Sequence, residues 1–473
     1  MNKSLFILLI TALSTFIQCI NPQPGTLQQT FKKTMPVLSD EQLLDTIQLT
    51  TFRYFWDAAE PFSGMARERY HMDGIYPEND KNIVTTGGSG FGLMAIIVGI
   101  ERGFITRYEG IKRFDKIISF LEKADRFHGA WSHWVNGETG KTKPFSPKDD
   151  GGDIVETAYL VQGLLTVRQY LNVNDAGEKE LRARIDSLCN SVEWSWYQKD
   201  GSAVLYWHWS PKYDWAMNFP IQGYNECLIA YIIGASSPAF PIATDAYHKG
   251  WARNGAIEKT SIKYGIPLEL AHNDNSEYGG PLFWSHYSYL GLNPKNLKDM
   301  YADYWRHNVN HVLIDRSYCI ENPKKFKGYG KDCWGLTASY SIPSRWENAS
   351  GKSRQDDLTR NTEVSYNAHS PANDHGVISP TAVLSSFPYA PKECMEVARF
   401  LYDSLGIQLL GPYGFYDAFS LEYNWFPQKY LAIDQGPIVV MIENSRTGLL
   451  WDLFMKNPEI QAGLLKLGFS FKN

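Results

Sequence analysis

Apolar and polar positions alternate with helical spacing along most of the chain from Asp40 onward. In the first such segment, Leu44, Ile47, Thr51 and Phe55 fall on one helix face after an acidic first turn. The pattern predicts a helix that packs one side against a core. Comparable amphipathic segments with charged outer faces follow, among them Ile111 to Ala124 and Glu178 to Trp196.

A second kind of segment is apolar on nearly all of its faces and follows a turn rich in Gly, Asp, Asn or Pro. Such a segment is typical of a helix that is buried on every side. Glycine suits the turn because it lets backbones approach closely at a crowded helix start. Six of these segments occur, at Phe91 to Ile97, Ile154 to Leu165, Glu226 to Ile233, Leu336 to Tyr340, Thr381 to Phe387 and Ile438 to Met441.

Buried helices that alternate with amphipathic helices predict an all-α fold of the (α/α)6 toroid type, in which an outer ring wraps an inner ring. An irregular multi-helix bundle would give a similar pattern and stays an alternative. Strand-like pieces such as Val204 to Trp209 are expected to form short β-hairpins in loops over the rim. No linker divides residues 40–473, which are therefore predicted to form one domain of catalytic size.

The first 20 residues have a different character. A lysine precedes an apolar run from Leu5 to Ile10 that is too short to span a bilayer, which is typical of a secretory signal peptide. Cys19 stands where a bacterial lipoprotein would be cut and lipidated, although the residue before it is not the usual small one. Residues 21–39 are polar, contain proline and suit a flexible tether. We expect export to the periplasm or cell envelope, with a lipid anchor at Cys19 as one option.

Aromatic residues are unusually frequent, with 15 Trp, 28 Tyr and 24 Phe. Aromatic faces serve core packing and also stack on flat neutral ligands. The net charge is −5 and no run of basic residues occurs, so a nucleic acid or an anionic membrane surface is not expected as a partner. No integral membrane span is predicted within the domain. The cysteines after Cys19 are five in number at irregular spacings, which indicates buried single thiols.

The densest acidic cluster lies between Asp149 and Glu156. Asp153 and Glu156 have the spacing of a helix capping box, so these acids would serve a helix start without any further function. A cap needs only one acid, however, and Asp149, Asp150, Asp153 and Glu156 fall within eight residues. Convergence of several carboxylates at the inner rim would supply the acid and base of glycosidic cleavage.

Two further carboxylates stand in aromatic or apolar surroundings. Glu226 follows Gly223 and Tyr224 and precedes an apolar helix, where removal from water would raise its pKa as a general acid requires. Asp417 is the one carboxylate of an aromatic loop. Both have a structural interpretation as well, Glu226 as a first-turn acid and Asp417 as a turn residue.

Several aromatic residues stand next to hydrogen-bonding side chains. This mixture suits sugars, whose C–H faces stack on rings while their hydroxyls need polar partners. Most aromatics must still pack in the core. Metal and nucleotide motifs are absent from the sequence, so no metal ion or cofactor is predicted. The candidate sugar-binding residues are Trp131, His133, Trp207, His208 and Tyr224.

Four stretches together resemble the glucoamylase-like family of exported bacterial proteins and, within it, glycoside hydrolase family 144, the β-1,2-glucanases. The likeness covers residues 40–473. The stretches are Thr85 to Gly92, Asp149 to Glu156, Gly223 to Glu226 and Asp434 to Pro437.

The resemblance implies an (α/α)6 toroid, hydrolysis with inversion and independence of metal ions. Members of the family either cut within the glucan chain or release sophorose from its non-reducing end. Residue by residue, the resemblance implies Glu226 as the general acid, and Asp149, Asp153 and Glu156 as further acids of the site. Asp417, matched by its loop context, is implied as the base that activates water.

We therefore expect an enzyme that hydrolyses a neutral β-1,2-glucan or its oligosaccharides. Exo release of sophorose is favoured because the long loops Asn273 to Ser288 and Ser341 to His375 would wall one end of a cleft. Endo action stays an alternative, as does a non-catalytic glycan-binding lipoprotein, which would need aromatics and a tether but no acid pair. A polysaccharide lyase would need a cluster of Arg or Lys to hold a uronic carboxylate, and none stands out in the sequence.

Overall fold

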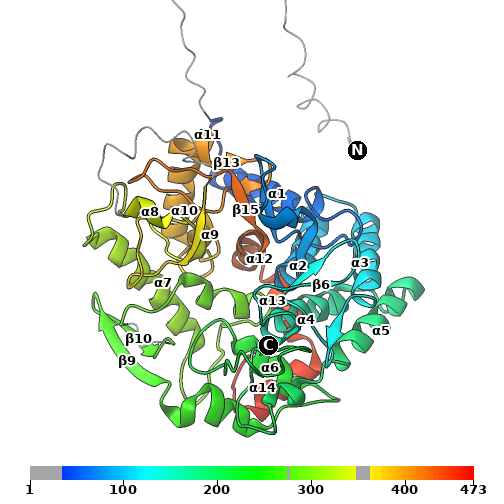
Figure 1. The fold of residues 1–473 in the computed structure, drawn as a ribbon. Helices are drawn as coiled ribbons and strands as arrows, with labels where there is room; N and C mark the ends of the chain where they lie inside the picture. The colour runs from blue at the N-terminus through cyan, green and yellow to red at the C-terminus, as the bar shows by residue number, and fades with distance from the viewer. Residues whose placement is uncertain (1–34, 274–276, 348–362, 473) are drawn as a thin grey trace, which may run out of the picture. The chain divides into compact units, whose positions relative to one another are not determined.

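Helices form most of the framework in the computed structural model, which describes residues 35–273, 277–347 and 363–472 (Figure 1). The predicted signal peptide, Cys19 and most of the predicted tether lie outside these residues. The first helix, α1 (Asp40–Trp56), begins where the sequence predicts it, with Ser39 and Gln42 forming a capping box. The amphipathic segments form α3 (Arg107–Leu121) and α5 (Ala176–Asn190), the latter ending before its predicted limit.

Five of the six predicted buried helices are present. Each packs against the next in the order α9, α12, α2, α4 and α6, and α1, α3 and α5 lie outside α2, α4 and α12 (Figure 1). This helix-rich arrangement of inner and outer helices is consistent with an α/α toroid. The inner helices are α2 (Thr86–Glu101), α4 (Ile154–Tyr170), α6 (Leu228–Ser236), α9 (Pro380–Leu384) and α12 (Ala432–Arg446).

The remaining helices pack around these or connect them. Among them, α10 lies against α9, α13 against α4 and α12, and α14 against α6. They are α7 (Tyr304–Glu321), α8 (Ser344–Glu347), α10 (Pro391–Arg399), α11 (Gly406–Leu409), α13 (Leu449–Met455) and α14 (Pro458–Lys466). Short 3₁₀ or π segments are Pro77–Asn82, Trp194–Gln198, Ala246–Trp251, Arg253–Gly255, Leu282–Ser285, Tyr287–Tyr289 and Phe400–Ser404.

Helices α2 and α4 meet through their main chains. A Cβ atom added to Gly90 would lie 2.2 Å from the Tyr159 carbonyl oxygen, and one added to Gly163 would lie 2.2 Å from the Gly90 carbonyl oxygen. Only glycine fits at both positions without moving a helix. The contact fixes the spacing of the two helices and hence of the turns that precede them.

The remaining prediction, a buried helix from Leu336 to Tyr340, is wrong. Its second half belongs to strand β11 (Ala338–Ser341), which pairs antiparallel with β12 (Ser365–Ala368). On its other edge, the Tyr340 N–H donates to Asp417 Oδ2 at 2.7 Å. A short buried run has no periodicity that separates helix from strand, so long-range pairing decided the outcome.

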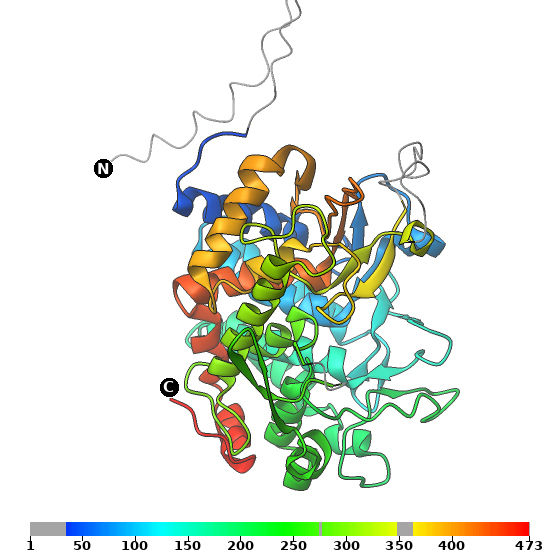
Figure 2. The same ribbon diagram turned by 90° about the vertical axis from the view of Figure 1, so that its left-hand side faces the viewer.

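The strands form seven small antiparallel sheets of two or three strands each within the described residues. In Figure 2, β1, β2, β5 and β11 lie on one side of the fold, and α10, α13 and α14 lie on the other. The pairs are β1 (Arg69–His71) with β15 (Lys429–Leu431), β3 (Arg126–Phe127) with β4 (Ala130–Trp131), β7 (Gly152–Asp153) with β8 (His208–Trp209), β9 (Glu258–Lys263) with β10 (Ile266–Leu270), and β13 (Leu410–Gly411) with β14 (Gly414–Phe415); β2 (Ile83–Thr85), β5 (Trp134–Asn136) and β6 (Thr142–Lys143) form the three-stranded sheet.

The core is aromatic, and six tryptophans are almost completely buried in it. Cys189, Cys227, Cys319, Cys333 and Cys394 are buried and free, as predicted. Among the described helices, none combines the length and apolar character needed to cross a bilayer.

Four buried histidines make the free energy of unfolding depend on pH. Burial lowers the pKa of His286 to about 3 and that of His311 to about 4, and it lowers the pKa of the hydrogen-bonded pair His272 and His307 as well. In the unfolded chain these side chains titrate near pH 6.5 and bind protons that the folded chain excludes. Their contribution to stability is therefore present above about pH 6.5 and is lost as the pH falls below it.

As the pH falls from about 6.5 to 4, each of these buried histidines should lower the free energy of unfolding by up to about 1.4 kcal/mol per pH unit. Buried acids with a raised pKa, such as Glu156 and Glu226, act in the opposite direction over this range. His286→Gln retains a partner for the Ser386 hydroxyl, which lies 2.9 Å from His286 Nε2, but cannot take up a proton. Urea denaturation at several pH values should give this variant a plot of unfolding free energy against pH whose slope is less positive than that of the unchanged protein. Equal slopes would contradict the interpretation.

Candidate active site

The starts of four buried helices converge on one cavity. Residues at or just before the first turns of α2, α4, α6 and α12 line this space of about 370 Å³, together with β1, β5 and β11. Glu68, Glu156 and Glu226 bring carboxyl groups to it. Aromatic side chains supply much of the wall, among them Trp134, Phe145, Trp207, Phe283, Tyr287 and Tyr366.

Glu156 lies in the first turn of α4 and faces the start of α2. The Gly87 N–H donates to Glu156 Oε2 at 2.7 Å, and a Cβ atom on Gly87 would lie 2.6 Å from the same oxygen. Burial raises the pKa of Glu156 to about 7, with the charge of Asp153 acting in the same direction and His133 acting against it. Glu156 therefore exchanges a proton near neutral pH.

Asp153 caps α4 and also organises the cavity wall. One carboxylate oxygen accepts the N–H groups of Val155 and Glu156 at 3.0 and 2.9 Å, as the capping interpretation predicts. The other oxygen accepts hydrogen bonds from His133 Nδ1 and Trp207 Nε1, each at 3.1 Å. The capping interpretation is confirmed, and the same carboxylate also contacts two residues that line the cavity.

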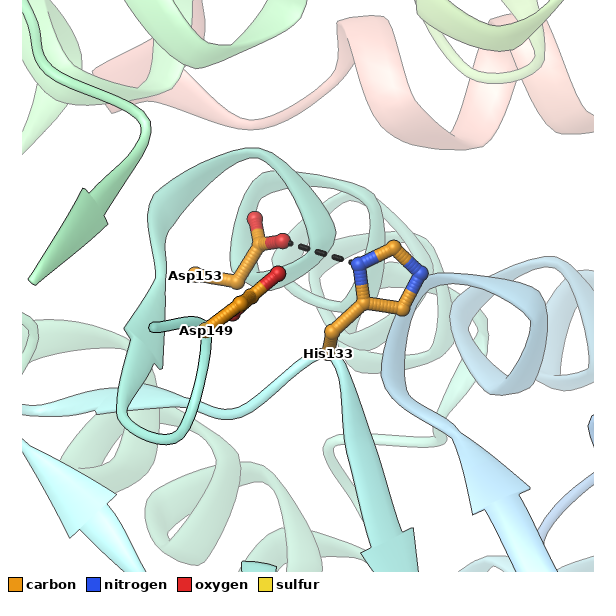
Figure 3. Close-up of side chains that lie close together, drawn as sticks. All are labelled: His133, Asp149 and Asp153. Carbon is orange, nitrogen blue, oxygen red and sulfur yellow. Dashed lines mark hydrogen bonds and ion pairs between the residues drawn. The ribbon is translucent and has the colours of Figure 1, made fainter. Parts of the chain in front are cut away.

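His133, Asp149 and Asp153 form a cluster beside the cavity (Figure 3). Burial alone would lower the pKa of His133, but the charges of Glu156, Asp153 and Asp149 outweigh it and raise this pKa to about 10. Burial also opposes the ionisation of Asp153, yet the hydrogen bond from His133 and the charges of His133 and His208 hold its pKa below the ordinary value. His133 and Asp153 are therefore ionised at neutral pH, and the cationic imidazole of His133 faces Glu156.

Asp149 completes the cluster from the turn before β7. Its Oδ1 atom lies 3.3 Å from His208 Nδ1, and both side chains are buried. Ligand atoms of His133, Asp149 and Asp153 lie within 4.8 Å of one another, a spacing that could hold a metal ion. The Asp153 oxygen that faces His133 already accepts two hydrogen bonds, so a cation there would have to displace the Trp207 indole N–H.

Glu226 stands just before α6 and is partly exposed to the cavity. Its carbonyl oxygen accepts hydrogen bonds from the hydroxyls of Tyr159 and Ser288, which fix the backbone at this position. Burial raises the pKa of Glu226 to about 7, and the negative charge of Glu156 adds to the rise. A carboxyl that keeps its proton near neutral pH is suited to act as a general acid.

Asp417 is placed differently from the other predicted acids. It is 2% exposed, lies behind β11 and is not among the residues that line the cavity. Its carboxyl group is hydrogen-bonded to that of Asp434. Burial raises the pKa of Asp417 to about 6, against the opposing hydrogen bonds from Asp434 and the Tyr340 N–H.

The predicted sugar-binding residues divide into two groups. Trp207 and His133 line the cavity, and His208 lies behind them against Asp149. Trp131 and Tyr224 are fully buried, with the Trp131 indole donating to the Leu121 carbonyl and the Tyr224 hydroxyl donating to Asn308. Their burial in the core does not support a contact with sugar.

Three cavity residues escape the sequence patterns. Glu68 stands between Arg67 and Arg69 in a short charged stretch that looks like ordinary surface, and no motif distinguishes it. Phe145 is exposed and stacks on His133 with ring centroids 4.2 Å apart. Tyr366 is exposed on β12 and faces the cavity from the opposite sheet. For Phe145 and Tyr366, the only indication in the sequence is the high overall frequency of aromatic residues.

A helix-rich fold whose aromatic cavity holds several carboxyl groups, two of them with a pKa near 7, is the arrangement expected of a protein of the glycoside hydrolase class. The Glycoamylase family model, which describes glucoamylase-like proteins, matches residues 218–458. The chain belongs to this family, which confirms the resemblance seen in the sequence.

Relatives of known name support the same conclusion. The chain is 45% identical to an exo β-1,2-glucooligosaccharide sophorohydrolase of Parabacteroides distasonis, over 93% of this chain and 59% of that protein. It therefore spans about three fifths of that relative's length. An endo-β-1,2-glucanase from Chitinophaga pinensis, solved with sophorotriose and glucose, is 59% identical over 92% of this chain and 99% of its own, with a TM-score of 0.86. An endo-β-1,2-glucanase from Talaromyces funiculosus, at 10% identity over 92% of this chain and 93% of its own with a TM-score of 0.62, shares the fold.

Proposed function

We propose that this protein hydrolyses β-1,2-linked glucan or its oligosaccharides. The observation that carries the proposal is Glu226, which is partly exposed at an aromatic cavity and has a pKa raised to about 7. Glu226 would protonate the oxygen of the leaving sugar. A water molecule activated by a carboxylate would attack the opposite face of the ring, which inverts the anomeric centre.

The aromatic wall supports a neutral sugar as the ligand. Phe145 and Trp207 offer ring faces beside the polar cluster, and Tyr366 offers one from β12. Rings of this kind stack on the C–H faces of glucose, while the carboxylates and His133 are available to its hydroxyls. The relatives named for β-1,2-glucan or sophorose point to the linkage.

For the mode of attack, we infer release of sophorose from the non-reducing end, the activity named for the Parabacteroides relative. The loops predicted to wall the cleft contribute Phe283 and Tyr366 to the cavity, whereas residues 274–276 and 348–362 lie outside the described part of the chain. Endo cleavage is the second candidate because the 59% identical Chitinophaga structure is named for it.

Product analysis on linear β-1,2-glucan tests both parts of the proposal. Exo action should give sophorose as the sole early product, whereas a ladder of oligosaccharides would show endo action. Proton NMR of the fresh product should detect the α-anomer first, because inversion acts on a β-linkage. A β-anomer at the start would exclude inversion, and an intact glucan would contradict the proposal itself.

Two further features of the sequence belong to the same proposal. We infer that the inner helices belong to a complete (α/α)6 toroid, supported by their side-by-side order from α9 to α6. We also infer that residues 1–20 direct export and that Cys19 is a candidate for lipidation, which would place the enzyme in the periplasm or cell envelope, where a glucan substrate can reach it. Metabolic labelling of a Cys19→Ser variant with a fatty acid tests the anchor.

A further inference from the structure

Two buried carboxyl groups lie directly under the cavity wall. Asp417 is 2% exposed and Asp434 is completely buried, and their side chains are hydrogen-bonded to each other. Two ionised carboxylates cannot form such a bond, because it requires a proton on one of them. Asp434 belongs to the first turn of α12, and Asp417 to the loop that follows β14.

The remaining hydrogen bonds of the pair leave room for this proton. Asp417 Oδ2 accepts the Tyr340 N–H at 2.7 Å, and Asp434 Oδ1 accepts the Tyr287 hydroxyl at 3.2 Å. Asp417 Oδ1 and Asp434 Oδ2 receive no hydrogen bond from an N–H or hydroxyl group of the described residues. Because buried polar atoms are almost always paired, a proton held between the two carboxyls supplies the missing partner.

The surroundings favour one negative charge on the pair, not two. Glu68 acts to raise the pKa of both carboxyls, and the hydroxyl groups of Tyr287, Tyr340 and Tyr366 also interact with one or both of them. Arg69 interacts with Tyr340 and Glu68. Burial, followed by the charge of Asp417, raises the pKa of Asp434 far above its ordinary value, so the proton resides on Asp434.

Tyr287 connects the pair to the cavity, which it lines. Because its hydroxyl hydrogen points to Asp434, the phenol oxygen remains as an acceptor for a hydroxyl group or water in the cavity. Without Asp434, the Tyr287 hydroxyl would be free to rotate, and Asp417 would lose its donor.

We infer that Asp417 and Asp434 share one proton at neutral pH, and that Asp434 is a positioning residue that fixes the ionised state of Asp417 and the orientation of the Tyr287 hydroxyl. The inference about turnover rests on the proposed hydrolase function. The shared proton itself does not depend on that function.

Infrared difference spectroscopy tests the shared proton without any substrate. At about pH 8.5, where groups with a pKa near 7 are ionised, the unchanged protein should show the carbonyl stretch of a protonated carboxyl. Both Asp434→Asn and Asp417→Asn should remove the contribution of the pair to this band, because either change leaves one carboxylate beside an amide donor. Asp315, whose pKa burial also raises far above its ordinary value, should contribute equally in all three proteins. Asp452→Asn, at an exposed position on α13, should leave it unchanged. A band that is absent from the unchanged protein, or that is undiminished in either variant, would overturn the inference.

Kinetics then test the positioning role. Asp434→Ala should lower kcat about tenfold or more while changing KM less than about twofold, because Asp434 is completely buried. Asp434→Asn should retain most of the activity, because its amide group can donate to Asp417 and its oxygen can accept the Tyr287 hydroxyl. Tyr287→Phe should reproduce part of the loss. Unchanged kcat in Asp434→Ala would show that the pair is structural only. Failure of the unchanged enzyme to cleave glucan would instead refute the proposed function and leave the infrared result standing.

Discussion

Glu226→Gln should lower kcat on linear β-1,2-glucan about a thousandfold. The glutamine keeps the size and most of the packing of Glu226 but has no proton to give to the leaving oxygen. The hydrogen bonds from Tyr159 and Ser288 go to the main-chain carbonyl oxygen of residue 226 and do not involve its side chain. The variant should therefore fold normally. Release of reducing sugar, measured from initial rates, gives the result directly.

The control for this experiment is Glu180→Gln, an identical change at an exposed position on α5. It should leave the rate unchanged. A near-normal rate in Glu226→Gln would refute Glu226 as the general acid. If the unchanged protein binds glucan but does not cleave it, the result would favour the alternative of a non-catalytic glycan-binding lipoprotein.

Asp153→Asn should lower kcat about a hundredfold and shift the melting temperature by only a few degrees. Asparagine is as good an N-cap as aspartate, so its oxygen can still accept the N–H groups at the start of α4. Its amide group would then face His133 and Trp207, which both donate to Asp153 in the unchanged protein. The asparagine N–H groups would then face the N–H groups of His133 and Trp207 without an acceptor between them. The His133 imidazolium would also lose the negative charge that lies nearest to it.

The matched control is Asp175→Asn, because Asp175 caps α5 in the same way, accepting the Glu178 N–H at 2.9 Å. Both variants should unfold at similar temperatures, and only Asp153→Asn should lose activity. Loss of the fold in Asp153→Asn alone would mean that its polar contacts serve stability. Normal turnover would mean that His133 and Trp207 do not need this partner.

Local patterns predicted the helices well because their signals lie within a few residues. The acids at the start of α4 are one such case, since capping spacing and clustering are both visible in the sequence. The strand at Ala338–Ser341 is a case that local patterns could not reveal, because its partner β12 lies more than twenty residues further on. Only tertiary pairing separates the two outcomes for so short a run.

Site residues that belong to one local motif could be predicted from the sequence. Contacts between residues from distant segments could not. Asp417 and Asp434 both belong to conspicuous stretches, but their side-chain pairing depends on how α12 packs behind β11. Glu68 reaches the cavity because its backbone pairs with Ile83 and Ala432, and nothing in its neighbours marks that contact. Trp131 shows the converse, since this aromatic residue beside polar ones is buried in the core.

The glycine contact between α2 and α4 has a consequence for redesign of this protein. Because main chain touches main chain at Gly90 and Gly163, the scaffold that holds Glu156 cannot widen or narrow in small steps. Substrate range is therefore better altered at the periphery, through exposed cavity side chains such as Phe145 and Tyr366. A mutant library aimed at longer or differently linked glucans should vary these exposed positions and leave α2 and α4 unchanged.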